Sequence, residues 1–294
     1  MSLPRIALAV CAFAAILSSA HAEGISTDRA AWNASQAPFR MYGNTWYVGP
    51  HGLSSILVDT KQGLALFDGD LPESAPQIEA HVRALGFRVR DIKWIFNSHA
   101  HVDHAGGIAA LQRASGAQVL ASAAGAHELE LGGADPSDPL YGSVPDYTPP
   151  RHVRVVRDGE TLQLGNVAIT AHYTPGHTPG STAWTWISCA NSRCLHIVYA
   201  DSLTAVTAPK FRFSSRPRYV AAFRRSIASV AAFPCDILLT PHPDASAFWE
   251  RVARSRSAAS VSALIDPSAC RSYAAEAARG LDARLAQEHA AKPM

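Results

Sequence analysis

The chain has 294 residues, of which 48% are hydrophobic and 17% are charged, and its formal net charge is +2. This composition supports a sizeable core and excludes a disordered or low-complexity protein. The small net charge, without a run of lysine and arginine, argues against nucleic acid or an anionic membrane as the main partner. The length fits one large domain or two small ones.

The first 22 residues have the pattern of a secretory signal peptide. One basic residue, Arg5, precedes an apolar run from Ile6 to Leu17, and Ala20-His21-Ala22 matches an A-x-A cleavage site. The apolar run has 12 residues, too few to span a bilayer, so a membrane anchor is not expected. We expect cleavage after Ala22 and export of residues 23–294 to an oxidising compartment.

The mature chain would contain four cysteines, an even number that suits disulfide bonds in an exported protein. Cys189 and Cys194 flank a short polar turn, so they can close a hairpin. Cys235 and Cys270 would then pair over a longer loop. Sequence alone permits three connectivities, and proximity favours this one. A zinc-thiolate site is the alternative, but no CxxC spacing supports it.

Hydrophobic spacing in the first half of the chain predicts alternating strands and helices. The predicted strands are 45–48, 54–59, 64–68, 92–96 and 119–121, and the predicted helices are 72–85, 105–114 and 123–131. Residues 132–150 contain eight glycines and prolines, which excludes a regular element. We interpret this segment as a loop that joins two halves, or as a wall of the site with Tyr141 or Tyr147 facing a substrate.

The second half repeats the alternation of strands and helices. Its predicted strands are 153–157, 167–172, 183–187, 195–200 and 237–240, and its predicted helices are 218–232 and 267–289. Two such halves, about 23–131 and 151–294, predict an α/β fold in one domain. Two mixed sheets would pack face to face with helices outside, as a four-layer αββα sandwich.

The residues that follow the predicted strand 92–96 carry the strongest chemical signal. They read His99-x-His101-x-Asp103-His104. In an extended segment, residues two apart point the same way, so His99 and His101 can bind one cation together. The chain then turns towards a predicted helix, which carries the other two side chains to a neighbouring position. This spacing indicates metal binding.

Two more histidines lie in rigid turns directly after predicted strands. His177 lies in Thr174-Pro175-Gly176-His177-Thr178-Pro179-Gly180, and His242 lies between Pro241 and Pro243. Proline fixes its own φ and restricts the residue before it. Such turns hold a ring in place before a metal arrives, as metal ligands require.

Five imidazoles and one carboxylate form a ligand set that suits zinc. A catalytic zinc ion keeps an open position beside three protein ligands, so six ligands predict two zinc ions per chain. The first would be bound by His99, His101 and His177, and the second by Asp103, His104 and His242. The two ions would share a hydroxide whose pKa is lowered towards 7, with Asp103 orienting it.

The motif from His99 to His104, followed by His177 and His242, resembles the metallo-β-lactamase superfamily and within it most resembles subclass B3. The resemblance extends over nearly the whole mature chain. It implies an αββα sandwich and a monomeric periplasmic enzyme without a membrane segment. It also implies zinc-dependent hydrolysis of the β-lactam amide of penicillins, cephalosporins and carbapenems, which confers antibiotic resistance.

The stretch that contains Asp201, Ser202 and Thr204 bears on the substrate. Thioesterases and lactonases of this superfamily carry a metal-bridging aspartate near this place, whereas subclass B3 has a serine, which Ser202 matches. The resemblance implies that Ser202 and Thr204 bind the substrate carboxylate. Asp201 keeps open the alternative of a hydrolase acting on a thioester or lactone. A zinc-scavenging protein without activity would need closed coordination, which ligands at strand ends around a groove do not favour.

Three other residues are candidates for supporting roles. Asp68 ends a predicted strand and can support the metal motif from behind. Trp46 and His51 can line a substrate groove, although a core position for Trp46 and a solvated one for His51 are the alternatives.

Overall fold

The computed structural model describes residues 29–257 and 264–291. The predicted signal peptide, residues 1–22, therefore lies outside the described residues. Within the described part of the chain, no helix is long and apolar enough to cross a membrane.

The described strands form two mixed sheets, one of seven strands in the order β1-β2-β3-β4-β5-β6-β7 and one of five in the order β12-β11-β10-β9-β8. The first sheet contains β1 (Phe39–Tyr42), β2 (Thr45–Tyr47), β3 (Ile56–Asp59), β4 (Leu64–Phe67), β5 (Ile92–Phe96), β6 (Gln118–Ala121) and β7 (Arg154–Val155). The second contains β8 (Thr161–Leu164), β9 (Val167–Tyr173), β10 (Thr182–Ala190), β11 (Arg193–Tyr199) and β12 (Ile237–Leu239).

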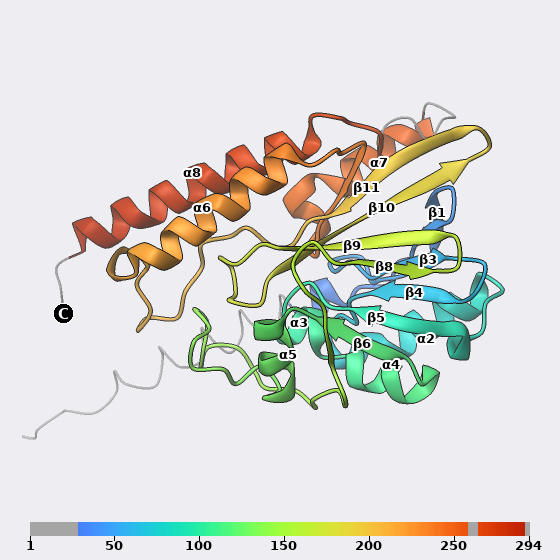
Figure 1. Cartoon of the computed structure of the whole chain (residues 1–294), viewed down its shortest axis with the longest axis horizontal. Coiled ribbons are helices and arrows are strands. Elements are labelled where there is room, and N and C mark those ends of the chain that lie inside the picture. The colour runs from blue at the N-terminus through green and yellow to red at the C-terminus, as the bar shows by residue number, and fades with distance from the viewer. Residues whose placement is uncertain (1–28, 258–263, 292–294) are drawn as a thin grey trace, which may run out of the picture.

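Helices cover the outer faces of both sheets (Figure 1). The α-helices are α2 (Ala75–Ala84), α3 (Val102–Ala105), α4 (Ile108–Ser115), α5 (Ala123–Glu130), α6 (Pro217–Ala232), α7 (Phe248–Ser257) and α8 (Ala269–Ala290). Short 3-10 helices are η1 (Pro72–Ser74), η2 (Val89–Asp91), η3 (Phe213–Ser215) and η4 (Pro243–Ser246). Helices α2, α4 and α5 lie outside the first sheet, and α6 and α8 lie outside the second. The predicted four-layer αββα sandwich is confirmed.

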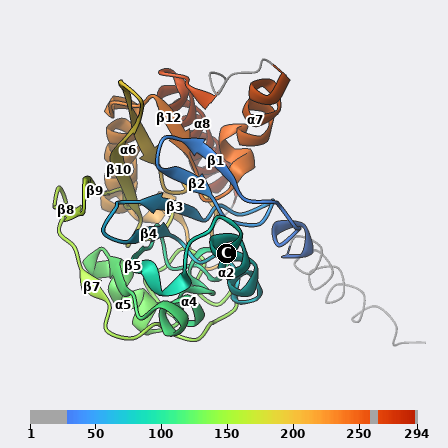
Figure 2. The ribbon, with the colours of Figure 1, turned by 90° about the vertical axis from the view of Figure 1, so that its right-hand side faces the viewer.

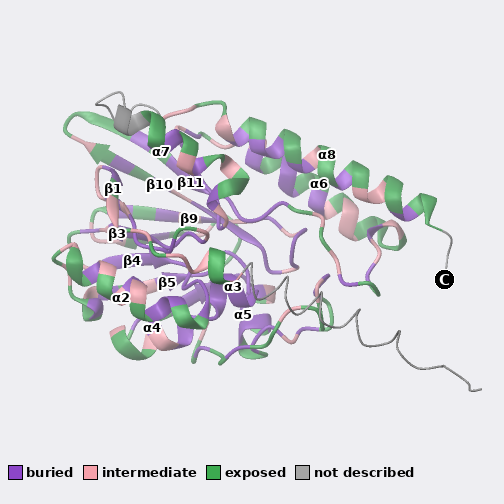
Figure 3. Ribbon diagram, turned by 180° about the vertical axis from the view of Figure 1, so that it is seen from behind, coloured by how far each residue is buried: buried purple, intermediate pink, exposed green. Residues whose placement is uncertain are grey.

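Aromatic rings, some stacked and some edge-on, pack between the two sheets. The rings of Phe67 and Trp186 are 4.6 Å apart, and those of Phe96 and Trp184 are 4.7 Å apart. Phe67 and Phe96 belong to the first sheet and the two tryptophans to the second, so these contacts set the separation of the sheets. Figure 3 shows the buried residues concentrated in the strands and on the inner sides of the helices.

Helix α7 lies beside β1 and β2, where Phe248 stacks on Tyr47 with ring centroids 5.4 Å apart (Figure 2). The sequence pattern predicts neither α7 nor the short strands β1 and β8. Helix α7 is rich in charged residues; Phe248 and Val252 are buried in the inner core, and Trp249 packs partly buried against it. Four-residue strands with one or two buried positions give too little alternation to detect.

The helix predicted at 105–114 is two helices in the structure, α3 and α4, with Gly106 and Gly107 between them. The oxygen of Gly69 approaches Gly107 so closely that a Cβ atom there would lie 2.1 Å from it. The backbone N–H of Gly69 donates to the oxygen of His104 at 2.9 Å. This close contact fixes the metal motif against the end of β4.

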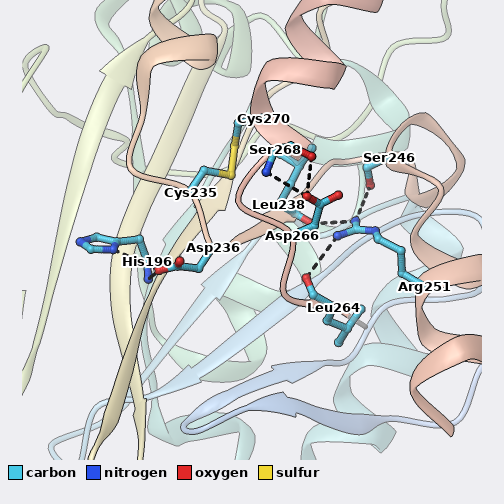
Figure 4. The surroundings of a disulfide bond; sticks show 10 residues. All are labelled: His196, Cys235, Asp236, Leu238, Ser246, Arg251, Leu264, Asp266, Ser268 and Cys270. Carbon is cyan, nitrogen blue, oxygen red and sulfur yellow. Dashed lines mark hydrogen bonds and ion pairs between the residues drawn. A yellow bond between two sulfur atoms is a disulfide. The ribbon is translucent and has the colours of Figure 1, made fainter. Parts of the chain in front are cut away.

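Residues 132–150 contain no helix or strand, as their composition predicts. The next strand, β7, still pairs with β6, so the chain changes sheets after Val155. Both expected disulfides are present. Cys189–Cys194 links β10 to β11, and Cys235–Cys270 links the residues before β12 to α8 (Figure 4).

Candidate metal centre

The metal motif begins in the loop between β5 and α3 and continues into α3, and Asp68 holds that loop from behind. Its carboxylate accepts hydrogen bonds from the backbone N–H of Ser98 at 2.8 Å, from the Ser98 hydroxyl at 2.6 Å and from the Tyr199 hydroxyl at 2.7 Å. Burial raises the pKa of Asp68 to about 7, although these donors act to lower it. Asp68 thus fixes the backbone directly before His99.

His99, His101 and His177 form the first of two trios of side chains. Their ligand atoms all lie within 4.8 Å of one another, and the three rings are almost fully buried. The outer nitrogens are held by other groups: Nδ1 of His99 is 2.7 Å from Asp201, and Nδ1 of His177 is 3.0 Å from the carbonyl oxygen of Thr204. Because Nδ1 of each of these two rings is engaged, Nε2 remains for a metal.

Asp103, His104 and His242 form the second trio. Oδ2 of Asp103 is 3.2 Å from Nε2 of His104 and 3.2 Å from Nε2 of His242, and these two nitrogens are also 3.2 Å apart. Zinc bonds of about 2.0–2.1 Å in a tetrahedral site place neighbouring ligand atoms about 3.3 Å apart. The triangle therefore has the dimensions of three zinc ligands.

The two trios lie side by side and are built in the same way. The rings of His99 and His104, one from each trio, have centroids 4.4 Å apart. The first trio takes His99 and His101 from the loop after β5, and the second takes Asp103 and His104 from α3. The third member of each follows a strand of the second sheet, His177 after β9 and His242 after β12. The centre therefore lies where the ends of strands from both sheets meet.

A buried ring nitrogen without a hydrogen-bond partner and the protonation states of the site residues are also consistent with metal binding. Nε2 of His99 is buried without a hydrogen-bond partner, which is costly unless a ligand satisfies it. Burial, then the neighbouring His104 and His101, hold the pKa of His99 well below its usual range. Burial opposes ionisation of Asp103, but His104 and His242 still hold its pKa well below the ordinary value. Neutral imidazole and ionised carboxylate are the forms that bind zinc.

Asp201 lies on the Nδ1 side of the His99 ring and belongs to neither trio. It is completely buried, and its carboxylate accepts from Nδ1 of His99. Burial raises the pKa of Asp201, while His177 acts to lower it. The next residue, Ser202, lines the cavity beside the trios. In this arrangement Asp201 orients a ring and Ser202 faces the place where a substrate would lie.

A cavity of about 430 Å³ opens onto both trios. Its polar lining consists mainly of His101, Asp103, His177, Ser202, Thr204 and His242, and its apolar lining of Trp32, Val102, Leu140, Val144, Pro145 and Val206. The apolar residues come from four separate segments of the chain, which the fold brings together around the cavity. Such a cavity suits a small molecule with an apolar body and a few polar groups.

Four residues considered as possible substrate contacts lie elsewhere. Trp46 packs against Phe87 with ring centroids 6.1 Å apart, and the ring of His51 stacks on Trp249 at 4.4 Å. Tyr147 is buried, and its hydroxyl donates to the oxygen of Ala100 at 2.7 Å. Tyr141 is 49% exposed and is not among the residues that line the cavity. The loop 132–150 does form a wall, but with Leu140, Ser143, Val144 and Pro145.

Sequence reasoning missed Trp32, whose ring lies 5.4 Å from that of His242. It also missed Asp138, whose Oδ1 is 3.2 Å from Nε2 of His101. Trp32 comes from a segment far from the motif in sequence, and Asp138 comes from a loop without periodicity.

Comparison with known proteins agrees with this geometry. Residues 48–187 match a family model described as the metallo-beta-lactamase superfamily. The chain is 51% identical to the solved structure of Rm3 metallo-beta-lactamase, with a TM-score of 0.86, over 89% of this chain and 98% of that one. It is 50% identical to MEM-A1, a subclass B3 metallo-beta-lactamase from a soil metagenome library, with a TM-score of 0.86, over 88% of this chain and 99% of that one.

Matches to curated sequences are shorter. The chain is 35% identical to a hydroxyacylglutathione hydrolase of Anaeromyxobacter dehalogenans over 122 residues, which are 42% of this chain and 37% of the hydrolase. The chain spans between 28% and 54% of the lengths of the curated relatives that it matches. The two solved metallo-beta-lactamases, in contrast, are matched almost end to end.

Proposed function

Because this chain belongs to the metallo-β-lactamase superfamily and matches subclass B3 enzymes over nearly their whole length, we propose that it hydrolyses the amide bond of β-lactam antibiotics. The single observation that favours this substrate class over a thioester is the placement of two neighbouring residues. Asp201 supports His99 from behind, and Ser202 faces the cavity. A bridging aspartate, which the thioesterase reading requires, would have to lie between the trios.

The proposed cofactor is a pair of zinc ions. His99, His101 and His177 would hold the first, and Asp103, His104 and His242 the second. The orphaned Nε2 of His99 and the triangle with 3.2 Å sides in the second trio support this assignment. When bound, the two ions supply an activated water at neutral pH and a Lewis acid for the carbonyl oxygen.

The protein's own residues orient the attacking water and the substrate, and they allow a proton to pass from that water to the leaving group. Asp103 is ionised and 8% exposed at the floor of the cavity, so it can accept a hydrogen bond from the attacking water and hold it in line with the carbonyl carbon. The proton from that water can pass to the departing ring nitrogen, which balances the cleavage of the amide. No serine nucleophile is needed.

Substrate binding is assigned to the walls of the cavity. Ser202 and Thr204 line it and offer hydroxyl groups to the carboxylate that β-lactams carry beside the ring nitrogen. The carbonyl oxygen of Thr204 also accepts from Nδ1 of His177. Thr204 would therefore both bind the substrate and orient a metal-binding ring. Trp32, Leu140 and Val144 supply apolar contact and exclude bulk water.

We further propose that the enzyme acts as a monomer in the bacterial periplasm and includes carbapenems among its substrates. The export signal in residues 1–22 and the two disulfides support an oxidising compartment.

The test is hydrolysis of imipenem by the purified mature chain, first with zinc, then with a chelator, then with zinc restored. A thioester and a lactone are assayed in parallel. Zinc-dependent loss of the carbapenem chromophore is the expected result. Stable imipenem with rapid turnover of the thioester or lactone would keep the metal centre but overturn the substrate.

A further inference from the structure

Two buried acidic residues lie behind His101, on the side away from the other members of its trio. Asp138 is 3% exposed and Glu128 is 1% exposed. His101, Glu128 and Asp138 each offer a ligand atom within 4.8 Å of the others. Nε2 of His101 is 3.2 Å from Oδ1 of Asp138. In the ring of His101, Nε2 therefore faces the carboxylate of Asp138, and Nδ1 is left to face the metal centre.

This contact decides which nitrogen of His101 can bind a metal. A carboxylate oxygen accepts a hydrogen bond, so the nitrogen that faces it carries the proton. That nitrogen is Nε2, which leaves the lone pair of Nδ1 for the trio. In His99 and His177 the roles are reversed, because Nδ1 of each ring is engaged and Nε2 is left.

The same oxygen of Asp138 also holds the wall of the cavity. It accepts a hydrogen bond from the backbone N–H of Leu140 at 2.6 Å. The adjacent Pro139 accepts from the N–H of Ala208 at 2.7 Å, which ties this loop to the segment after Thr204. Leu140 lines the cavity. One carboxylate therefore fixes both a ring of the metal centre and a wall of the substrate cavity.

Glu128 is the third member of this cluster. It is in α5, whose end leads into the loop that carries Asp138. Of the two acidic residues, Asp138 is the one with a hydrogen-bond contact to His101 in the described structure.

We propose that Asp138 is a positioning residue that directs Nδ1 of His101 to the first zinc ion and couples that ligand to the cavity wall at Leu140. The inference rests on the proposed zinc centre and extends it to a residue outside both trios. Partners of this kind fix the orientation of a metal-binding ring, and their loss typically weakens metal binding about 10–100-fold.

The test compares Asp138→Asn with Asp135→Asn in the full chain. Asp135 is a matched control, because it lies in the same loop, is 6% exposed and accepts from the N–H of Ser137 at 2.8 Å. Asparagine keeps an acceptor for the Leu140 N–H but loses the charge behind His101. Zinc affinity, measured by competition with a chromophoric chelator, is expected to fall about 10–100-fold at one of two sites in Asp138→Asn and to stay unchanged in Asp135→Asn.

A measurement on the unaltered chain makes the result independent of how well a variant folds. Long-range ¹H–¹⁵N spectra of the zinc-loaded protein are expected to place the proton of His101 on Nε2 and the zinc on Nδ1. Zinc on Nε2 would overturn the proposal, and so would equal zinc affinity in the two variants. Three zinc ions per chain would also overturn it, because His101, Glu128 and Asp138 would then be a metal site. Failure of the proposed zinc centre looks different, because the unaltered chain would then bind no zinc. Failure of the proposed substrate alone would leave the zinc affinities and the position of zinc on His101 unchanged.

Discussion

The carboxylate of Asp201 lies 2.7 Å from Nδ1 of His99, and neither side chain is more than 1% exposed. The sequence left open whether this aspartate bridges two metals, as the thioesterase or lactonase alternative requires. The contact with Nδ1 places it behind the ring.

Replacing Asp201 with alanine should therefore weaken zinc binding at the first trio. The Nδ1 proton of His99 would lose its buried acceptor, and loss of such a partner typically costs about 10–100-fold in metal affinity. Titration with zinc in competition with a chelator measures this. Asp236→Ala is the control, because Asp236 pairs with His196 at 3.2 Å at the surface. Loss of the second zinc with the first retained would contradict the supporting role.

Replacing Asp103 with asparagine should remove most activity while leaving the first zinc bound. Asn cannot accept the proton of the water, and loss of a general base typically costs about 10²–10⁴-fold in rate. The asparagine also provides a weaker ligand for the second zinc. Steady-state hydrolysis and zinc content of the same preparation provide the two readouts. Turnover close to that of the unaltered chain would rule out the proposed role of Asp103.

Zinc should stabilise the fold, because each trio joins residues from two sheets. Binding only to the folded state at about 1,000 times the dissociation constant adds about 4 kcal/mol per site. For a chain of this size that corresponds to roughly 10 °C in the midpoint of thermal unfolding. Calorimetry with and without zinc measures the shift. Magnesium, which prefers oxygen ligands, is the control and should give none; equal midpoints with and without zinc would contradict the assignment.

Replacing Gly107 with alanine should destabilise the protein even without zinc. The added Cβ would lie 2.1 Å from the oxygen of Gly69, so the backbone of the metal motif must move. Overpacking of this kind typically costs about 1–3 kcal/mol. Urea unfolding of the zinc-free protein measures it. Gly280→Ala in α8 has nothing within 4 Å of the new Cβ and should be neutral or slightly stabilising. Equal stability of the two variants would contradict the close contact.

The disulfide Cys235–Cys270 should matter more than Cys189–Cys194. It closes a loop with a sequence separation of 35, against 5 for the other bond, which the chain-entropy model converts to about 4 and about 2 kcal/mol. His242 lies inside the longer loop, so Cys235→Ser with Cys270→Ser should also weaken zinc binding at the second trio.

The paired replacement Cys189→Ser with Cys194→Ser is the matched control, because that disulfide joins β10 to β11 at the end of a hairpin. Chemical unfolding and zinc titration of both double variants separate the two effects. Equal losses in the two variants would contradict the role assigned to the longer loop.

The strand before the metal motif could be predicted residue for residue, because Ile92–Phe96 is a short apolar run bounded by turns. The six side chains of the trios could be named for a related reason, since their spacing and their rigid turns are local features of the sequence. The residues that contact these six side chains could not be predicted. Asp138 and Trp32 reach the centre only through tertiary packing, and nothing near them in sequence marks them.

The division of predicted helix 105–114 has a similar cause. Two glycines in a helical pattern are tolerated in isolation, and only the approach of Gly69 from another segment makes them a break. Helix α7 was not predicted because its many charged residues leave too few apolar positions to show a helical pattern. Local sequence patterns thus predicted the ligands and most helices and strands. The cavity around the ligands depends on contacts between distant segments, which the sequence does not reveal.

The construction of both trios across the boundary between the sheets limits how this protein can change. His177 and His242 are carried by one sheet, and their four partners by the other. A substitution in the aromatic stack of Phe67, Phe96, Trp184 and Trp186 that shifts one sheet would move both histidines together. The two proposed metal sites are therefore linked through the packing of the sheets, so a change in the inner core that shifts one of them is expected to shift the other.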